Sequence, residues 1–195
     1  MKVIGVTGQS GSGKTTLCEI IEKNHNAKII DADKIAKELS NDSSSEYFKA
    51  IVDLFGQDIV KENGMLNRKK MASIIYSDKD MLEKLNNLTF KFVVDEINKR
   101  IDSLEKIDYC IIDAPLLYEA GIDKRCDFVI AVIANNENRI NRICKRDGIE
   151  KDIAFKRLNI QNTDDFYIKR ANYVIYNDNE KEHLRKSLDE ILGEI

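Results

Sequence analysis

The chain has 195 residues, 33% of them charged and 43% hydrophobic, which is typical of a soluble globular protein with one domain or at most two small ones. Its 31 basic and 34 acidic side chains give a net charge of −3, which offers no support for nucleic-acid binding. The four cysteines and two histidines lack metal-ligand spacing, so we predict reduced, mostly buried thiols. No run approaches the roughly 20 apolar residues of a membrane span, and the N-terminal run is too short for a signal peptide, which predicts a cytoplasmic protein.

Short β-branched runs, each followed by a longer polar segment compatible with a helix, recur along the chain. Near-continuous apolar strands that alternate with helices indicate a parallel sheet with both faces covered. We therefore predict an α/β fold, a three-layer α/β/α sandwich around a five-stranded parallel sheet. The predicted strands are Val3–Val6, Lys28–Ile30, Tyr109–Ile112, Phe128–Ile133 and Tyr173–Tyr176.

The first predicted strand leads into a segment that fits the P-loop pattern G-x-x-x-x-G-K-[ST], and a helix-compatible segment follows it. Glycines let the backbone wrap closely around a phosphate, and the loop N–H groups with the helix N-terminus attract its negative charge. We expect Lys14 to reach the β- and γ-phosphates of ATP and the Thr15 hydroxyl to bind Mg²⁺. The predicted ATP-binding residues of this segment are Gly8, Ser10, Gly11, Ser12, Gly13, Lys14, Thr15 and Thr16.

Two aspartates follow the second predicted strand, at the end where ligands of open α/β sheets bind. If the chain stays extended there, Asp31 and Asp33 project to the same side. A carboxylate in this place can accept the proton of an acceptor hydroxyl, which would separate a kinase from an ATPase or a GTPase. The alternative is that Asp33 caps a helix that begins at Lys34.

From about residue 33 to 106 no clear strand is predicted. Hydrophobic residues between Leu85 and Leu104 recur at helical spacing, and Ser45 has the character of a helix cap. We predict a helical subdomain inserted into the sheet-forming chain. At the C-terminus Leu184, Leu188, Ile191 and Ile195 predict one apolar helix face.

The third predicted strand ends in Asp113, followed by Ala114-Pro115-Leu116-Leu117-Tyr118-Glu119. An apolar strand that ends in Asp resembles a Walker-B element, which holds Mg²⁺ directly or through water. Glu119 is as compatible with a solvated carboxylate as with one that faces the substrate.

Three arginines after the fourth predicted strand share a helical spacing: Arg139, Arg142 and Arg146. Asp147-Gly148 then breaks the helix, and a second basic helical stretch contains Arg157. A pair of basic helices suits a lid that closes over ATP and stabilises the transferred charge. The alternative is an ordinary solvated basic face.

Taken in order, these motifs resemble the dephospho-coenzyme A kinase family, within the nucleoside-monophosphate-kinase-like P-loop proteins. The resemblance covers nearly the full chain, and its Asp-Ala-Asp and Asp-x-Pro-Leu-Leu-Tyr-Glu pieces are more specific than the P-loop. The matching segments are Val6-Thr7-Gly8 with the P-loop, Ile30-Asp31-Ala32-Asp33 with Ile35-Ala36, Gly64-Met65-Leu66-Asn67-Arg68, Leu85-Asn86, Asp113 to Glu119, Arg142 to Gly148, Arg157 with Gln161, and Ala171 to Ile175 leading to Asn177.

The resemblance implies transfer of a phosphoryl group from ATP, with Mg²⁺, to the ribose 3′-hydroxyl of dephospho-coenzyme A, the last step of coenzyme A synthesis. It implies one P-loop kinase domain over residues 1–195, with a nucleotide-binding core (about 1–32, 107–145 and 166–195), an acceptor-binding helical subdomain (about 33–106) and a lid (about 146–165). ATP and dephospho-coenzyme A would be its small-molecule partners. We expect no nucleic-acid or membrane partner, and a monomer or weak homo-oligomer.

The same resemblance implies roles for individual residues. Asp33 would be the catalytic base, Arg142 and Asn177 would lie near the adenine, and Arg157 on the lid would approach the phosphates. The expected catalytic residues are then Asp33, Lys14, Arg142 and Arg157, and Thr15 and Asp113 are the expected metal ligands. The expected acceptor-binding residues are Thr7, Asp31, Asp33, Leu116, Tyr118 and Glu119.

The chain departs from the family pattern in several places. Phe90-Lys91 stands where His-Pro is usual, Asn67 and Asn172 replace Asp, and Arg139 occupies a place often filled by Gln. The first departure falls in the predicted acceptor subdomain, so it concerns the choice of acceptor and not phosphoryl transfer.

Three other functions stay open at this point. A kinase of the same fold for another nucleoside or nucleotide would share the P-loop and the lid, and a non-catalytic nucleotide-binding relative would keep the P-loop alone. A guanine-nucleotide switch would need Asn-Lys-x-Asp, and the nearest segment, Asn98-Lys99-Arg100-Ile101, lacks the Asp.

Overall fold

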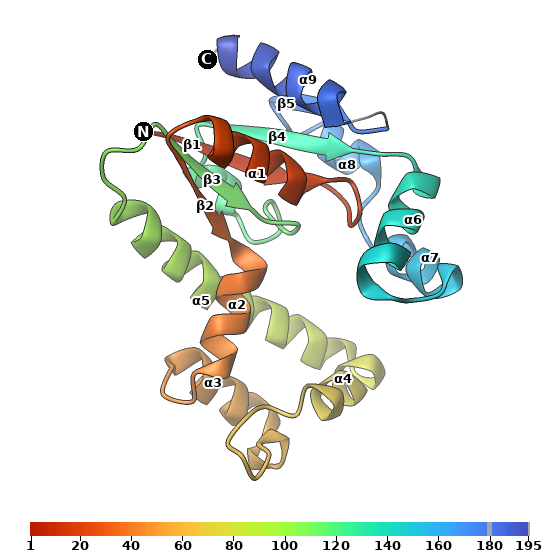
Figure 1. The fold of residues 1–195 in the computed structure, drawn as a ribbon. Coiled ribbons are helices and arrows are strands. Elements are labelled where there is room, and N and C mark those ends of the chain that lie inside the picture. The colour runs from red at the N-terminus through yellow and green to blue at the C-terminus, as the bar shows by residue number, and fades with distance from the viewer. Residues whose placement is uncertain (179–180, 195) are drawn as a thin grey trace. The chain divides into compact units, whose positions relative to one another are not determined.

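The computed structural model describes residues 1–178 and 181–194, and the chain divides into two compact units. The first unit comprises Met1–Ile30 and Leu104–Ile195, and the second comprises Asp31–Ser103 (Figure 1). None of the helices within the described ranges has the length and apolarity that a membrane span requires.

The first unit is built on a five-stranded sheet with the strand order β2-β3-β1-β4-β5. β1 pairs in parallel with both β3 and β4, and β4 pairs in parallel with β5. All six residues of β4 are buried, as expected of a central parallel strand covered on both faces. The strands are β1 (Lys2–Thr7), β2 (Ala27–Asp31), β3 (Tyr109–Asp113), β4 (Phe128–Ile133) and β5 (Tyr173–Tyr176), which confirms the predicted runs to within a residue at each end.

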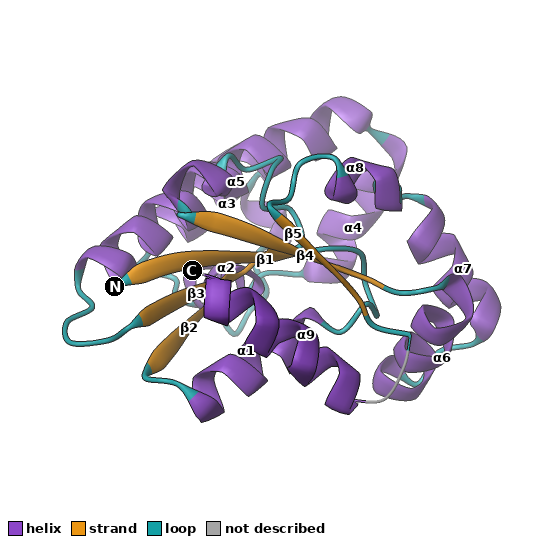
Figure 2. Cartoon of the chain, turned by 90° about the horizontal axis from the view of Figure 1, so that it is seen from above, coloured by secondary structure: helices purple, strands orange, loops and turns teal. Residues whose placement is uncertain are grey.

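Helices α1 (Lys14–Asn24) and α9 (Lys181–Glu194) lie on the same side of this sheet (Figure 2). Leu17 and Ile21 of α1 and Leu188 of α9 share one apolar core with the inward residues of the strands. The opposite face is packed by α8 (Asp164–Ile168), through Tyr167. The three-layer prediction is therefore confirmed, and the predicted face of the C-terminal helix is buried at Leu184, Leu188 and Ile191, while Ile195 lies outside the described residues.

A helical hairpin follows β4 and consists of α6 (Asn136–Asp147) and α7 (Lys151–Asn159). Gly148 ends α6 with φ 64°, a left-handed conformation that glycine adopts without steric cost. Ile143 of α6 packs against Ala154 and Leu158 of α7. The predicted break at Asp147-Gly148 is confirmed, and the short 3-10 helix η2 (Ile122–Arg125) completes this unit.

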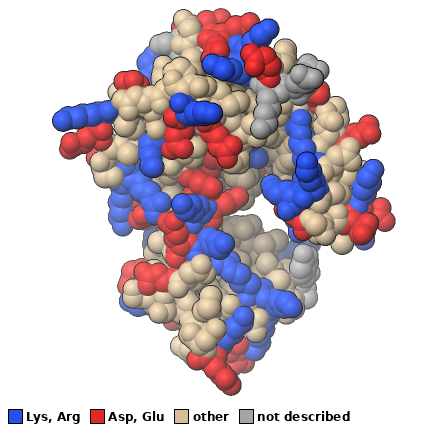
Figure 3. Space-filling view, viewed as in Figure 1, with Lys and Arg blue, Asp and Glu red and all other residues tan. Residues whose placement is uncertain are grey.

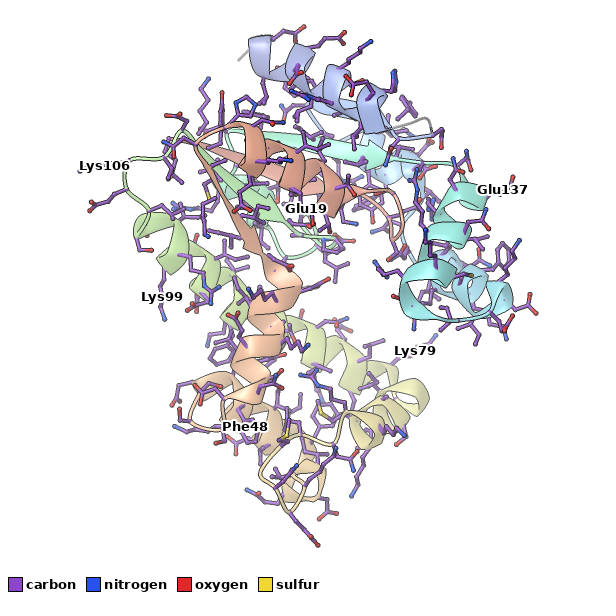
Figure 4. All side chains as sticks on the ribbon, viewed as in Figure 1. Glu19, Phe48, Lys79, Lys99, Lys106 and Glu137 are labelled. Carbon is purple, nitrogen blue, oxygen red and sulfur yellow. The ribbon has the colours of Figure 1, made fainter. Side chains whose placement is uncertain are left out.

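The second unit is helical, as predicted. Its elements are α2 (Ala32–Asn41), α3 (Glu46–Phe55), the 3-10 helix η1 (Gln57–Ile59), α4 (Arg68–Ser77) and α5 (Lys79–Asp102). Its core gathers Phe48, Ile51 and Ile59 with residues of α4 and α5, and Phe48 on α3 is labelled in Figure 4. Ser45 caps α3 by accepting a hydrogen bond from the Phe48 N–H, which confirms the predicted cap.

Two details of this unit bear on the acceptor predictions. Helix α2 begins at Ala32, and Asp31 is its cap, because the Asp31 carboxylate accepts a hydrogen bond from the Lys34 N–H. The alternative that Asp33 caps the helix is therefore wrong, and Asp33, in the first helical turn, does not continue the strand alternation. Helix α5 runs without a break through Phe90-Lys91, where proline is usual in the family that the sequence resembles.

Candidate active site

The loop between β1 and α1 forms a cradle of backbone groups at the N-terminus of α1. Gly13, at the cap position of α1, has φ 106° and no side chain to occupy the first-turn N–H groups. Gly11 lies against α6, since a Cβ at this position would stand 2.7 Å from the Arg139 carbonyl oxygen. The loop thus leaves its N–H groups to an anionic ligand and has no room for side chains on this side.

Lys14 folds back over the loop. Its ammonium Nζ donates hydrogen bonds to the Gly8 and Gln9 carbonyl oxygens, at 3.0 and 3.2 Å, and the residue is buried. A buried ammonium needs hydrogen-bonding partners, which these carbonyls supply. The positive charge therefore lies inside the loop, where the phosphates of a nucleotide would bind.

Thr15 and Asp113 meet beside the loop. The Thr15 hydroxyl donates to Asp113 Oδ2 over 3.0 Å, and Asp113 is only 6% exposed. The parallel register of β1 and β3, with Val6 opposite Asp113, brings the carboxylate to this position. Two hard oxygen donors suit Mg²⁺, which commonly takes one or two protein ligands and completes its shell with phosphate oxygens and water. Nowhere in residues 1–178 and 181–194 do three or more His, Cys, Asp or Glu side chains form a metal-holding group, so phosphate and water would have to supply the remaining ligands.

Arg142 and Asn177 come together on the P-loop from α6 and from the end of β5. Arg142 Nη1 donates to the carbonyl oxygens of Gly11 and Ser12, both at 3.2 Å, and its Nη2 donates to the Asn177 carbonyl oxygen at 2.8 Å. Asn177 Nδ2 donates to the Ser12 carbonyl oxygen at 2.7 Å. Both residues of the predicted adenine pair therefore contact the phosphate-binding loop directly.

Arg157 lies in the helical hairpin and is bound to a neighbouring carboxylate. Its Nη1 lies 2.8 Å from Asp147 Oδ2, and its side chain is 52% exposed. The hydrogen bond from Arg146, with the charges of both arginines, lowers the pKa of Asp147. Lys and Arg side chains gather over α6 and α7 (Figure 3), where Glu137 marks the start of α6 in Figure 4. Arg157 thus belongs to a basic, exposed hairpin, and its predicted approach to the phosphates stays a prediction.

A set of contacts behind the P-loop is not predicted by the sequence. Ser10 is held twice by Gln161: its N–H donates to Gln161 Oε1 at 3.0 Å, and Gln161 Nε2 donates to the Ser10 hydroxyl at 2.9 Å. Gln9 Nε2 donates to the Asn162 carbonyl oxygen at 2.6 Å. Only the pairing of Arg157 with Gln161 in the family pattern pointed to this segment.

Arg139 requires a correction. The common helical spacing placed Arg139, Arg142 and Arg146 on one face, but Arg139 is 1% exposed, Arg142 is half-buried and Arg146 is exposed. Arg139 and Arg146 differ by only about 20° around the helix axis but lie about 10 Å apart along it, so the difference in their burial comes from their position along α6 and not from the helix face. Arg139 donates to the Ser10 carbonyl oxygen and to the Gln9 side-chain oxygen.

The predicted acceptor residues of the first unit lie in the segment after β3 or contact it. The Thr7 hydroxyl donates to the Pro115 carbonyl oxygen at 3.4 Å, Leu116 is 47% exposed, and Asn162 Nδ2 donates to the Glu119 carboxylate. Burial raises the pKa of the Tyr118 hydroxyl to about 12, so it stays a neutral donor. A polar cavity of about 540 Å³ is lined by residues that include Tyr118, Glu119, Asp123, Lys124 and Arg170.

With a phosphate-binding loop after β1, a hydroxyl–carboxylate pair beside it and an arginine-bearing hairpin after β4, the first unit has the construction of a P-loop kinase. The sequence profile of the family described as dephospho-CoA kinase matches residues 2–183. The chain belongs to the dephospho-CoA kinase family.

Individual relatives agree with this assignment. The chain is similar to a dephospho-CoA kinase of Fusobacterium nucleatum subsp. nucleatum, with 37% identity over 187 residues that cover 96% of this chain and 95% of that protein. A dephospho-CoA kinase structure from Campylobacter jejuni superimposes with a TM-score of 0.69 at 26% identity and covers 100% of this chain and 97% of that one. A solved structure from Thermus thermophilus superimposes with a TM-score of 0.83, also at 26% identity, with the same coverage.

Proposed function

We propose that this protein transfers the γ-phosphoryl group of ATP to the ribose 3′-hydroxyl of dephospho-coenzyme A, giving coenzyme A and ADP. The observation that carries the proposal is the family match over residues 2–183, on a chain whose P-loop has Lys14 and the Thr15–Asp113 pair in place. In the transfer the acceptor oxygen bonds to the γ-phosphorus and the bond from that phosphorus to the β,γ-bridging oxygen breaks. The hydroxyl proton passes to a protein carboxylate.

On the donor side, the P-loop backbone and Lys14 would hold the β- and γ-phosphates, because their charges complement the phosphate oxygens. The Thr15 hydroxyl and the Asp113 carboxylate would hold Mg²⁺, whose chemistry when bound is to neutralise charge on the phosphate oxygens. Arg142 and Asn177 would orient the nucleotide from the base side, and Arg157 would add positive charge near the transferred group from the lid (residues 146–165). The other nucleotide-binding residues would be Gly8, Ser10, Gly11, Ser12, Gly13 and Thr16.

On the acceptor side, Asp33 would accept the hydroxyl proton and align the hydroxyl oxygen with the γ-phosphorus. Asp33 is an exposed residue in the first turn of α2. The second unit would bind the acceptor together with Asp31, and Thr7, Leu116, Tyr118 and Glu119 of the first unit would contribute as well.

The proposal extends to the partners of the protein, its compartment and its oligomeric state. A net charge of −3 favours small-molecule partners over nucleic acid, and we place the protein in the cytoplasm as a monomer or weak homo-oligomer.

The test is an assay of the purified protein with ATP, Mg²⁺ and dephospho-coenzyme A, in which ADP formation is coupled to a spectroscopic signal. Mass spectrometry of the product should show the acceptor with one added phosphate, and phosphorus NMR should place it on the ribose 3′ position. ADP binding without any phosphate gain would refute the proposed acceptor. Adenosine and AMP would then be assayed as nucleoside-like acceptors, with Phe90-Lys91 as the first positions to vary.

A further inference from the structure

The strongest unexplained feature of the first unit is the buried cation Arg139. It lies in the first turn of α6, where the helix dipole favours anions and disfavours a positive charge. Its nearest carboxylate, Asp164, stands 3.6 Å away from Nη1. Burial lowers the pKa of Arg139 and raises that of Asp164, so for both partners the loss of solvation outweighs their mutual attraction. A charge in such a place destabilises the fold unless its other contacts compensate for it.

The side-chain hydrogen bonds of Arg139 to the described residues go to the phosphate-binding loop. Arg139 Nε donates to the Ser10 carbonyl oxygen at 3.3 Å, and Nη1 donates to the side-chain oxygen of Gln9. Gln9 and Ser10 are the first two variable positions of the loop, where the chain turns from β1 around the expected phosphate site. One guanidinium therefore binds both the backbone and a side chain of this turn.

The same turn is also tied to the segment after α7. Gln161 makes two hydrogen bonds to Ser10, and the Gln9 amide donates to the Asn162 carbonyl oxygen. Asp164, the partner of Arg139, lies two residues further on, and a cavity of about 270 Å³ is lined by Gln9, Arg139, Gln161 and Asp164 among others. The guanidinium of Arg139 thus contacts the loop at Gln9 and Ser10 and the segment after α7 at Asp164.

We propose that Arg139 is a positioning residue for nucleotide binding: it holds Gln9 and Ser10 in the shape that the β-phosphate requires and joins that shape to residues 161–164. The inference rests on the proposed use of ATP as donor and is independent of the identity of the acceptor. Arg139 acts through the loop and touches no reacting atom.

The first test is Arg139→Gln, with Lys145→Gln as the matched control on the exposed side of the same helix. ADP affinity is measured by isothermal titration calorimetry with Mg²⁺ and without acceptor. Because hydrogen bonds from a charged group are stronger than those from a neutral one, we expect ADP to bind about tenfold more weakly to Arg139→Gln and with unchanged affinity to Lys145→Gln. In the assay the KM for ATP should rise about as much, while kcat falls less than about threefold and the KM for the acceptor stays constant.

A double-mutant cycle separates positioning from a general loss of stability. If Arg139 acts through Gln9, then Gln9→Leu weakens ADP binding as well, and the double variant binds little worse than either single one. Additive losses, or an unchanged ADP affinity in folded Arg139→Gln, would overturn the inference. Should Arg139→Gln fold poorly because Asp164 is left unpaired, Arg139→Gln with Asp164→Asn removes both charges and carries the same expectation. ADP binding needs no acceptor, so a failure of the proposed acceptor assignment leaves this test decisive.

Discussion

The two units of the molecule organise their polar groups in opposite ways. In the first unit, the P-loop is bound by side chains from widely separated segments that the parallel sheet brings together: Asp113, Arg142, Gln161 and Asn177. In the second unit, the long helix α5 packs against α2, α3 and α4, and separate side-chain pairs link the helices, such as Arg100 with Glu38 of α2 and Arg68 with Ser40. In the first unit the polar groups converge on one loop, and in the second they form separate pairs at or near the surface.

The difference predicts that nucleotide binding in the first unit is more sensitive to substitution than the helical faces of the second unit. A phosphate cradle made of backbone groups is held by its whole surroundings, so a change at one of its buried partners propagates through the network. Residues on exposed helical faces, such as Asp33, vary with little structural cost. The departure at Phe90-Lys91 lies in the helical unit, where substitutions are expected to cost less stability than in the phosphate cradle.

The largest effect is expected from Lys14→Ala. It deletes the charge that stabilises the β- and γ-phosphates, a type of interaction whose loss costs about 10³-fold or more in turnover. We expect phosphoryl transfer to fall to the background of the coupled assay, and ADP affinity to fall as well. Urea unfolding monitored by circular dichroism controls for stability, since Lys14 also donates to two loop carbonyls. Turnover close to that of the unmodified protein would remove the P-loop from the mechanism.

Asp33→Asn tests the second, helical unit, and it should leave nucleotide binding by the P-loop unchanged. If Asp33 accepts the acceptor proton, kcat falls by roughly 10²–10⁴-fold, while ADP affinity stays within about twofold. The matched control is Asp53→Asn, an exposed aspartate on α3, for which full activity is expected. If both variants turn over equally well, Asp33 serves no catalytic role.

Lys91→Pro tests whether the units are energetically separable. Helix α5 is continuous from Lys79 to Asp102, and a proline in its middle removes a hydrogen bond and clashes with the preceding turn, which costs about 3 kcal/mol. We expect the unfolding free energy of the helical unit to fall by that amount in urea titrations, and ADP to bind as before. Lys91→Ala is the control, since an exposed substitution in a helix changes stability by less than about 0.5 kcal/mol. Loss of ADP binding in folded Lys91→Pro would show that the two units act as one.

The smallest effect concerns the thiols, all four of which lie outside the helical unit. Burial raises the pKa of Cys110 from 9.0 to about 11 and that of Cys126 from 9.0 to about 12. The unfolded chain therefore loses these protons first, so stability that is present below pH 9 declines as the pH rises toward 11. We expect the unfolding free energy of the first unit to be about 1–2 kcal/mol lower at pH 9.5 than at pH 8. A variant with Cys110→Ser and Cys126→Ser should show a weaker dependence, and an equal one would assign the effect to other groups.

The amino-acid sequence alone is sufficient to predict the local structure of this protein. Periodicity and residue types that act over one or two turns predict the five strands, the helical character of about residues 33–106, the cap at Ser45, the break at Gly148 and the P-loop motif. The family is also determined at this level, because its motifs are short segments in a fixed order.

The contacts between side chains that are distant in the sequence depend on the tertiary structure. Thr15 and Asp113 are 98 positions apart, and Gln9 and Arg139 are 130 apart, so their contacts depend on the order of the strands and on how the hairpin after β4 packs. No periodicity separates a buried arginine from an exposed one on the same helix, which is why Arg139 was placed on the basic face. The sequence left open whether Asp33 caps this helix, and the structure assigns the cap to Asp31, whose carboxylate accepts a hydrogen bond from the Lys34 backbone N–H.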